Sequence, residues 1–111
     1  MGRPAQRVLV AGGAIGRFGR FVDQPLTAIA TPVVRDALAT VGLTTKDIEA
    51  AFVGNAFGGA LAGQESILAQ VLLAPAGLAR IPMRTVKNAC SSGSDAVHLA
   101  WSAIAYGQYD C

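Results

Sequence analysis

Charged, aromatic and cysteine side chains are all scarce in this sequence. Only 14% of its 111 residues are charged and 6% are aromatic, whereas 52% are hydrophobic. So high an apolar fraction excludes the intrinsically disordered class. The longest stretch without a formal charge, residues 50–64, is 15 residues long and rich in glycine. A membrane-spanning helix needs roughly 18–20 apolar residues, so the sequence predicts one small domain with no membrane segment.

The charge balance and the two cysteines exclude several further classes. Cys90 and Cys111 are 21 positions apart, which fits neither a disulfide framework nor a metal site, so we expect no metal. The net charge is only +2. The early basic residues flank a strand-like run at 7–13, and we expect no nucleic-acid partner. The apolar run 8–15 is too short and glycine-broken for a signal peptide, which favours the cytoplasm. These basic residues are Arg3, Arg7, Arg17 and Arg20.

Strand-like and helix-like patterns alternate along the chain. Short apolar runs predict strands at 8–11, 51–54 and 84–88, and helical periodicity predicts helices at 26–41, 66–73 and 91–106. Pro32 fits the first helix only in its first turn, with Thr31 as the cap. Gly42 and Gly107 are expected to end the first and third helices, and residues 44–47 (TTKD) resemble a short capped turn. The βαβαβα order predicts an α/β domain with a parallel or mixed sheet and right-handed crossovers.

The predicted helix 91–106 is apolar on every side, and Asp95 carries its only formal charge. Such a helix is buried all round, and two other helices and three strands are too little material to surround it. Residues 109–111 also have the pattern of a further strand. We therefore expect a chain that is incomplete alone, with further protein or another subunit covering this helix.

Two glycine-containing segments are candidates for chemistry. Residues 11–16 (AGGAIG) have Ala11 in place of the first glycine of a dinucleotide-binding fingerprint, and no helix follows directly. Residues 88–93 (NACSSG) join a predicted strand to the apolar helix. There Cys90 lies at a helix N-terminus, where free N–H groups and the helix dipole stabilise the reactive thiolate. A buried packing cysteine is the alternative, but the small residues after Cys90 favour a nucleophile.

Several segments, in order and in register, resemble the thiolase superfamily, whose members make or cleave β-ketoacyl-CoA. The resemblance covers nearly the whole chain but only the first quarter to third of a typical member, so residues 1–111 are identified as a partial thiolase N-terminal domain. The segments are 16–19 (GRFG), 52–55 (FVGN), 62–64 (AGQ), 85–93 (TVKNACSSG) and 103–110 (AIAYGQYD).

The resemblance implies that Cys90 takes an acyl group from coenzyme A as a thioester, with its backbone N–H as an oxyanion donor. An acyl-CoA is then the substrate, no further cofactor is expected, and the intact protein is a homodimer or homotetramer. The sterol-carrier-like branch of the family offers an alternative, retro-aldol cleavage with an OB-fold partner. A further alternative is a non-catalytic or partner-dependent subunit. The family's Gly-His-Pro and Cys-x-Gly motifs do not occur in this sequence, so we expect the chain alone to be inactive.

His98 is the only histidine, and it does not fit the role of the missing base. Eight positions along a straight helix separate it from Cys90 by about 12 Å and rotate it by about 80°. A base must come within about 3 Å of the proton that it moves. We therefore expect His98 to be a packing or interface residue, and Cys111 to occupy a strand.

Overall fold

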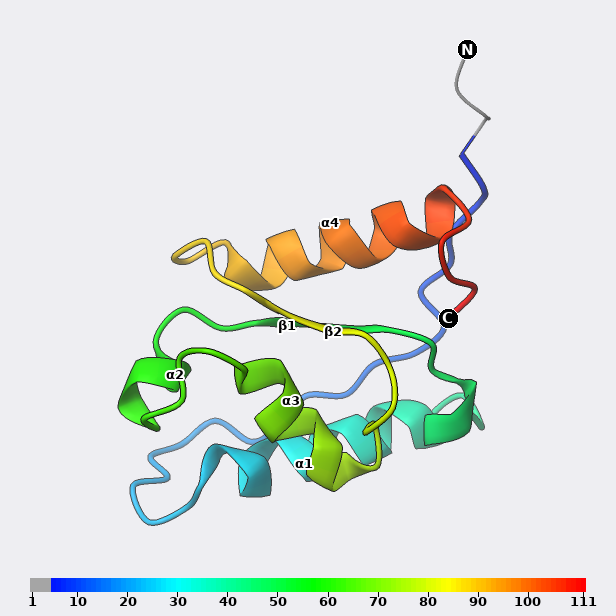
Figure 1. Cartoon of the computed structure of the whole chain (residues 1–111). Helices are drawn as coiled ribbons and strands as arrows, with labels where there is room; N and C mark the ends of the chain where they lie inside the picture. Colours follow the sequence, from blue (N-terminus) through cyan, green and yellow to red (C-terminus); the bar gives the residue numbers. More distant parts are fainter. Residues whose placement is uncertain (1–4) are drawn as a thin grey trace.

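The structure is a computed structural model that describes residues 5–111, so Arg3 of the early basic group lies outside the described residues. Strands β1 (Ala51–Gly54) and β2 (Met83–Val86) form a parallel sheet in which Ala51 pairs with Met83 and Gly54 with Val86. Helix α4 (Ser92–Ala105) lies on one face of this sheet (Figure 1). Helices α1 (Leu26–Ala39) and α3 (Leu68–Leu73) lie on the other. The α/β class and the parallel pairing are as predicted.

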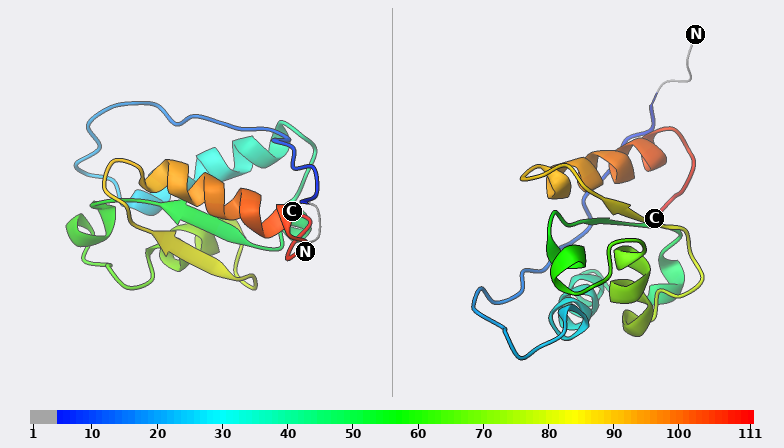
Figure 2. Two further views of the ribbon diagram at one scale, coloured as in Figure 1. Left: turned by 90° about the horizontal axis from the view of Figure 1, so that it is seen from above. Right: turned by 60° about the vertical axis from the view of Figure 1, so that its left-hand side comes forward.

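The buried core lies between the sheet and the helices α1 and α3. The leucines of α3 are almost completely buried together with Leu78. Apolar residues of α1 and of both strands pack around them, and Figure 2 shows this layer on the side of the sheet opposite α4. The cluster consists of Leu68, Leu72, Leu73 and Leu78.

Helix α1 begins at Leu26, so the prediction that Pro32 lies in its first turn is wrong. Pro25 precedes the helix, Thr31 caps nothing, and Pro32 is exposed within the helix interior. Apolar residues from the first turn onward pack against the core, and this burial offsets the hydrogen bond that Pro32 cannot make. The predicted end is confirmed: Gly42 takes φ +68°, and the Leu43 N–H donates to the Leu38 carbonyl at 3.1 Å.

Shorter elements connect these layers. The 3₁₀ turn η1 (Thr45–Asp47) is closed by a capping box, in which the Thr44 backbone N–H donates to the Asp47 carboxylate at 2.7 Å. Two other elements have no counterpart in the predicted set: a single-turn helix α2 (Gly58–Leu61) in the glycine-rich loop, and the turn η2 (Ala74–Ala76) after α3. In α2 the Asn55 side chain accepts a hydrogen bond from the Gly58 N–H at 2.5 Å.

Residues 8–11 form no strand, which corrects the prediction. A Cβ on Gly12 would lie 2.5 Å from Thr40 Oγ1, and one on Gly16 would lie 3.0 Å from Val33 Cγ2. The segment therefore runs along α1 in the opposite direction. A strand also needs a hydrogen-bonded neighbour, and within residues 5–111 no strand pairs with this segment.

Residues 109–111 likewise form no strand, although they lie beside the start of β1. The Glu49 N–H donates to the Cys111 carbonyl at 2.9 Å, and the Glu49 carboxylate accepts from the Asp110 N–H at 2.6 Å. These contacts hold the segment beside β1 without a strand ladder, so the expectation that Cys111 occupies a strand is wrong.

Helix α4 is buried on its sheet side and open on the other. Its buried residues are Ser92, Ala96, Ala103 and Ala105, whereas Val97 is 67% exposed and Trp101 is 41% exposed. None of the helices in the described part of the chain is long and apolar enough to cross a membrane.

Candidate active site

The candidate site is the turn that joins β2 to α4. It contains Ala89, whose φ of +45° is the one positive value at a non-glycine residue between positions 5 and 111. This left-handed conformation is strained for alanine, at roughly 1–3 kcal/mol. Surrounding contacts must therefore hold the turn, and Cys90 is the residue that directly follows Ala89.

Two serine hydroxyl groups hold this turn. The Ser92 hydroxyl accepts from the Asn88 N–H at 2.9 Å and donates to the Ala89 carbonyl at 2.7 Å. Ser92 is 4% exposed, whereas Ser91 is exposed and its hydroxyl donates to the Asn88 carbonyl at 2.8 Å. The Ser92 bonds therefore lie on both sides of the strained residue.

The end of β1 supports the same turn from below. A Cβ on Gly54 would lie 2.4 Å from the Ser92 carbonyl oxygen and 2.7 Å from the Gly93 Cα. Only glycine allows the strand and the first turn of α4 to approach so closely. The Asn55 N–H continues the strand pairing with a 3.1 Å bond to the Val86 carbonyl. The N-terminus of α4 is thus fixed at the carboxyl end of the sheet.

Cys90 is exposed, two positions before the first residue of α4. Exposure does not fit the alternative of a buried packing cysteine. Among residues 5–111, the N–H groups of Gly93 and Ser94 have no hydrogen-bond acceptor. Free N–H groups at a helix N-terminus favour an anion, such as a thiolate or the oxyanion of a thioester intermediate.

His98 lies on the exposed surface of α4, away from this turn. Its ring stacks on that of Trp101, with centroids 5.8 Å apart and planes 18° apart, and Tyr106 meets Trp101 edge-on at 6.5 Å. The stacking agrees with the packing role expected from the sequence. Within the described residues, no group of three His, Cys, Asp or Glu side chains is placed to hold a metal ion.

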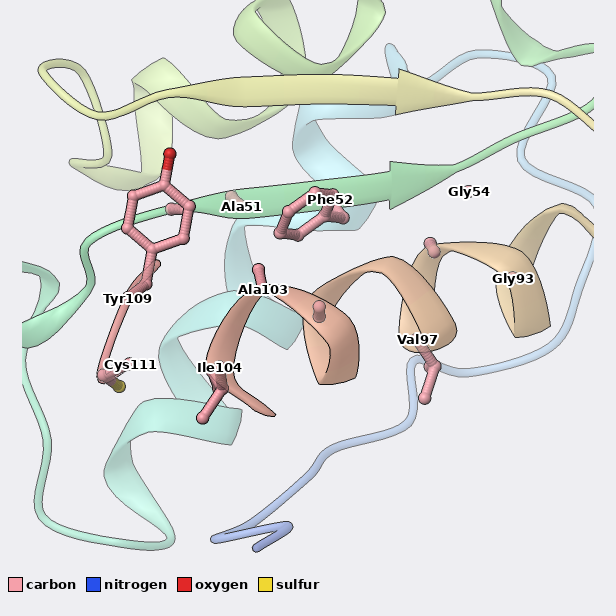
Figure 3. A pocket seen from close by; sticks show the side chains of 12 residues that line it. Ala51, Phe52, Gly54, Gly93, Val97, Ala103, Ile104, Tyr109 and Cys111 are labelled. Carbon is pink, nitrogen blue, oxygen red and sulfur yellow. The ribbon is translucent and has the colours of Figure 1, made fainter. Parts of the chain in front are cut away.

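A cavity of about 310 Å³, which no sequence pattern predicted, lies between β1 and α4. Gly54 and Gly93, which adjoin the Cys90 turn, line one end, whereas Tyr109 and Cys111 line the other (Figure 3). Its walls are mostly small apolar side chains of the strand and the helix. Cys111 therefore lies at the opposite end of α4 from Cys90, and the structure does not bring the two cysteines together.

Residues 8–111 match the protein family described as "Thiolase, N-terminal domain". The chain belongs to this family. Curated thiolase relatives include the acetyl-CoA acetyltransferases of Methanocaldococcus jannaschii, 33% identical over 103 residues, and of Allochromatium vinosum, 36% identical over 107 residues. The sterol carrier protein 2 of Gallus gallus is 31% identical over 110 residues.

The matches cover almost all of this chain but only part of each relative. They include 93% of the chain and 26% of either acetyltransferase, and 96% of the chain and 19% of the sterol carrier protein. The chain thus spans about a quarter of the length of the acetyltransferases that it matches. It corresponds to the N-terminal part of a thiolase, and the Cys90 turn lies inside the matched region.

Proposed function

We propose that this chain carries the acyl-accepting nucleophile, Cys90, of a thiolase-type acyltransferase that acts on acyl-CoA. The observation that carries the proposal is the position of Cys90, exposed on a braced turn at the N-terminus of α4 in a member of the thiolase family. A nucleophile needs access to substrate, and the exposure of Cys90 supports that role.

In the proposed step, Cys90 Sγ attacks the carbonyl carbon of the acyl-CoA thioester. A bond forms between Sγ and the acyl carbon, the bond from that carbon to the CoA sulfur breaks, and CoA leaves as a thiol with the proton of Cys90. A carbanion from a second acyl-CoA then attacks the acyl carbon: a carbon–carbon bond forms, the bond to Sγ breaks, and the β-ketoacyl-CoA leaves while Cys90 recovers the proton taken from the second acyl-CoA. In the degradative direction Sγ attacks the β-keto carbon of a β-ketoacyl-CoA, the bond between that carbon and the α-carbon breaks, and the shortened acyl-CoA leaves with the proton of Cys90. The CoA thiol then attacks the acyl-enzyme, takes the acyl group and returns its proton to Sγ. The free N–H groups at the start of α4 and the Cys90 N–H are the proposed oxyanion donors.

The names of the relatives bear on the reaction in different ways. The acetyltransferases are named for transfer of an acetyl group, whereas the name of the sterol carrier protein states no reaction. Retro-aldol cleavage is the alternative that the resemblance to the sterol-carrier-like branch raised. The exposed Cys90 favours acyl transfer, because retro-aldol cleavage does not require a thiol nucleophile. We therefore propose acetyl-CoA or a related short acyl-CoA as the substrate.

The general base must come from residues outside this sequence, since His98 is engaged with Trp101 on the surface of α4. We propose that the functional protein is a homodimer or homotetramer and that these 111 residues alone are inactive. The apolar outer surface of α4 favours a second candidate, a subunit that depends on a separate partner chain. A reading frame that continues past Cys111 into Gly-His-Pro and Cys-x-Gly motifs would favour the first candidate.

The test uses the intact protein that contains this chain, with the variants Cys90→Ser and Cys111→Ser as a matched pair. Incubation with radiolabelled acetyl-CoA, followed by peptide mapping, should place the label on Cys90 in the wild type and in Cys111→Ser. Cys90→Ser should lose both the label and thiolysis activity while its circular dichroism spectrum is unchanged. Thiolysis above a few per cent of wild type in folded Cys90→Ser would rule out Cys90 as the nucleophile.

A further inference from the structure

We infer that Ser92 is a positioning residue for Cys90: its buried hydroxyl holds Ala89 in the left-handed conformation and thereby sets the thiol at the N-terminus of α4. The inference rests on the proposed role of Cys90 as nucleophile. It adds a residue that touches neither the acyl group nor the coenzyme and acts only through the backbone.

The hydrogen-bond chemistry of the hydroxyl leaves one arrangement. A backbone N–H can only donate, so the Ser92 oxygen must accept from Asn88, and its single proton is then free for the Ala89 carbonyl. Both bonds have ordinary lengths, 2.9 Å for the N–H···O bond and 2.7 Å for the O–H···O bond. The hydroxyl therefore links the Asn88 N–H, which precedes the strained residue, to the carbonyl of Ala89 itself. No other side chain in residues 5–111 bonds both of these groups.

Burial of Ser92 restricts the movement of these two hydrogen bonds. Ser92 is the one buried polar residue of the described chain, and its backbone rests on Gly54 at the end of β1. Neighbouring Ser91 provides a natural comparison, because it is exposed and its hydroxyl bonds only the Asn88 carbonyl. We expect that loss of the Ser92 hydroxyl lets Ala89 relax to a negative φ, which changes the position of Cys90 relative to the N-terminus of α4.

The experiment measures the alkylation rates of both cysteines in one sample of the intact protein by iodoacetamide at pH 7, with peptide mass spectrometry. The readout is the Cys90 rate divided by the Cys111 rate, with Cys111 as the internal reference at the far end of α4. We expect a ratio well above one in the wild type. Ser92→Ala should lower it about fivefold, which corresponds to about 1 kcal/mol, the lower end of what loss of the two hydrogen bonds costs. The control Ser91→Ala should stay within about twofold of wild type.

A rescue variant separates positioning from a merely structural role. Glycine adopts a positive φ without strain, so Ala89→Gly combined with Ser92→Ala should restore at least half of the lost ratio. A variant that had simply lost packing around Ser92 would not be restored by this change. If the circular dichroism spectrum shows that Ser92→Ala alone does not fold, the alkylation ratio of the double variant decides whether Ser92 positions Cys90.

Each outcome bears on a different claim. A wild-type ratio near one would overturn the proposed nucleophile itself. A high wild-type ratio that Ser92→Ala leaves unchanged would overturn the positioning role and leave the nucleophile standing. A fall in Ser92→Ala without recovery in the double variant would also overturn the role assigned to Ser92.

Discussion

Replacing Gly54 with alanine tests the contact that fixes α4 on the sheet. The added methyl group would lie 2.4 Å from the Ser92 carbonyl oxygen, 2.6 Å from the Ser92 carbonyl carbon and 2.7 Å from the Gly93 Cα. All three atoms belong to the backbone, so no side chain can rotate away. Ordinary contact begins near 3.4 Å, and the first turn of α4 must therefore move by about 1 Å.

The size of the effect follows from this overlap. Overpacking of a close contact lowers the free energy of unfolding by about 1–3 kcal/mol. The relatives are about four times as long as this chain, so at an unfolding entropy of about 2.1 cal/mol/K per residue each kcal/mol lowers the Tm of an intact protein of that length by about 1 °C. Gly54→Ala in the intact protein should therefore melt about 1–4 °C below the wild type. A displacement of about 1 Å at a reacting group can also lower catalysis by about a hundredfold.

Thermal melting followed by circular dichroism measures the first effect, and the alkylation ratio of Cys90 to Cys111 measures the second. Gly93→Ala is the matched control, since a Cβ there meets nothing within 4 Å. Alanine is also the better helix former, so this control should melt at or above the wild-type temperature. If Gly54→Ala has the Tm and the alkylation ratio of the wild type, the end of β1 does not contact the start of α4 as closely as the structure indicates. The proposal that β1 holds the Cys90 turn in place would then be refuted.

Two further predictions concern the rest of the fold. Leu68→Ala removes a side chain that is 1% exposed and should lower the free energy of unfolding, measured by denaturant titration, by about 2–5 kcal/mol. The control Leu61→Ala changes a side chain that is 87% exposed and should alter it by less than about 0.5 kcal/mol. Equal effects would contradict the assigned core. Hydrogen bonds from the Thr44 backbone N–H and hydroxyl lower the pKa of Asp47 below its ordinary value of 3.8. The ionised carboxylate therefore stabilises η1 fully at a pH above 3.8. This stabilisation is lost as the pH falls through the lower pKa of the folded state. Asp47→Asn should melt lower than wild type at neutral pH and approach it in acid, and a difference in Tm that is independent of pH would refute the assignment.

Local sequence patterns predicted the elements whose hydrogen bonds close within a few residues and those that bury one apolar face. The strand at 51–54 has the predicted bounds, and the third strand and all three helices lie within a few residues of theirs. Glycine ends α1 and α4 as expected because a left-handed residue after a helix is a local requirement. The capped turn after Thr44 depends on contacts three residues apart. Such features depend on neighbours in the sequence, which a sequence displays directly.

Features that depend on distant partners were not predicted. Residues 8–11 have the composition of a strand, but a strand forms only where a second one supplies hydrogen bonds. The position of Pro32 was misjudged for a related reason, since burial of the apolar side of α1 outweighed the local preference of proline. Neither partner pairing nor tertiary burial is encoded in a short window of residues.

The candidate site divides along the same line. Cys90 was predicted as the nucleophile from a small-residue motif before a helix, whereas Gly54 and Ser92 were included only as members of the segments 52–55 and 85–93. Their proposed roles come from the geometry of the turn. The Ser92 hydroxyl bonds groups on both sides of the strained Ala89, and the absence of a Cβ on Gly54 lets the end of β1 contact the start of α4. A thiol is recognisable from its chemistry, but the groups that aim it are ordinary residues that act through the backbone. Substitutions at Ser92 and Gly54 therefore test the fold and the mechanism together, because in this turn the same contacts that support the helix also place the sulfur.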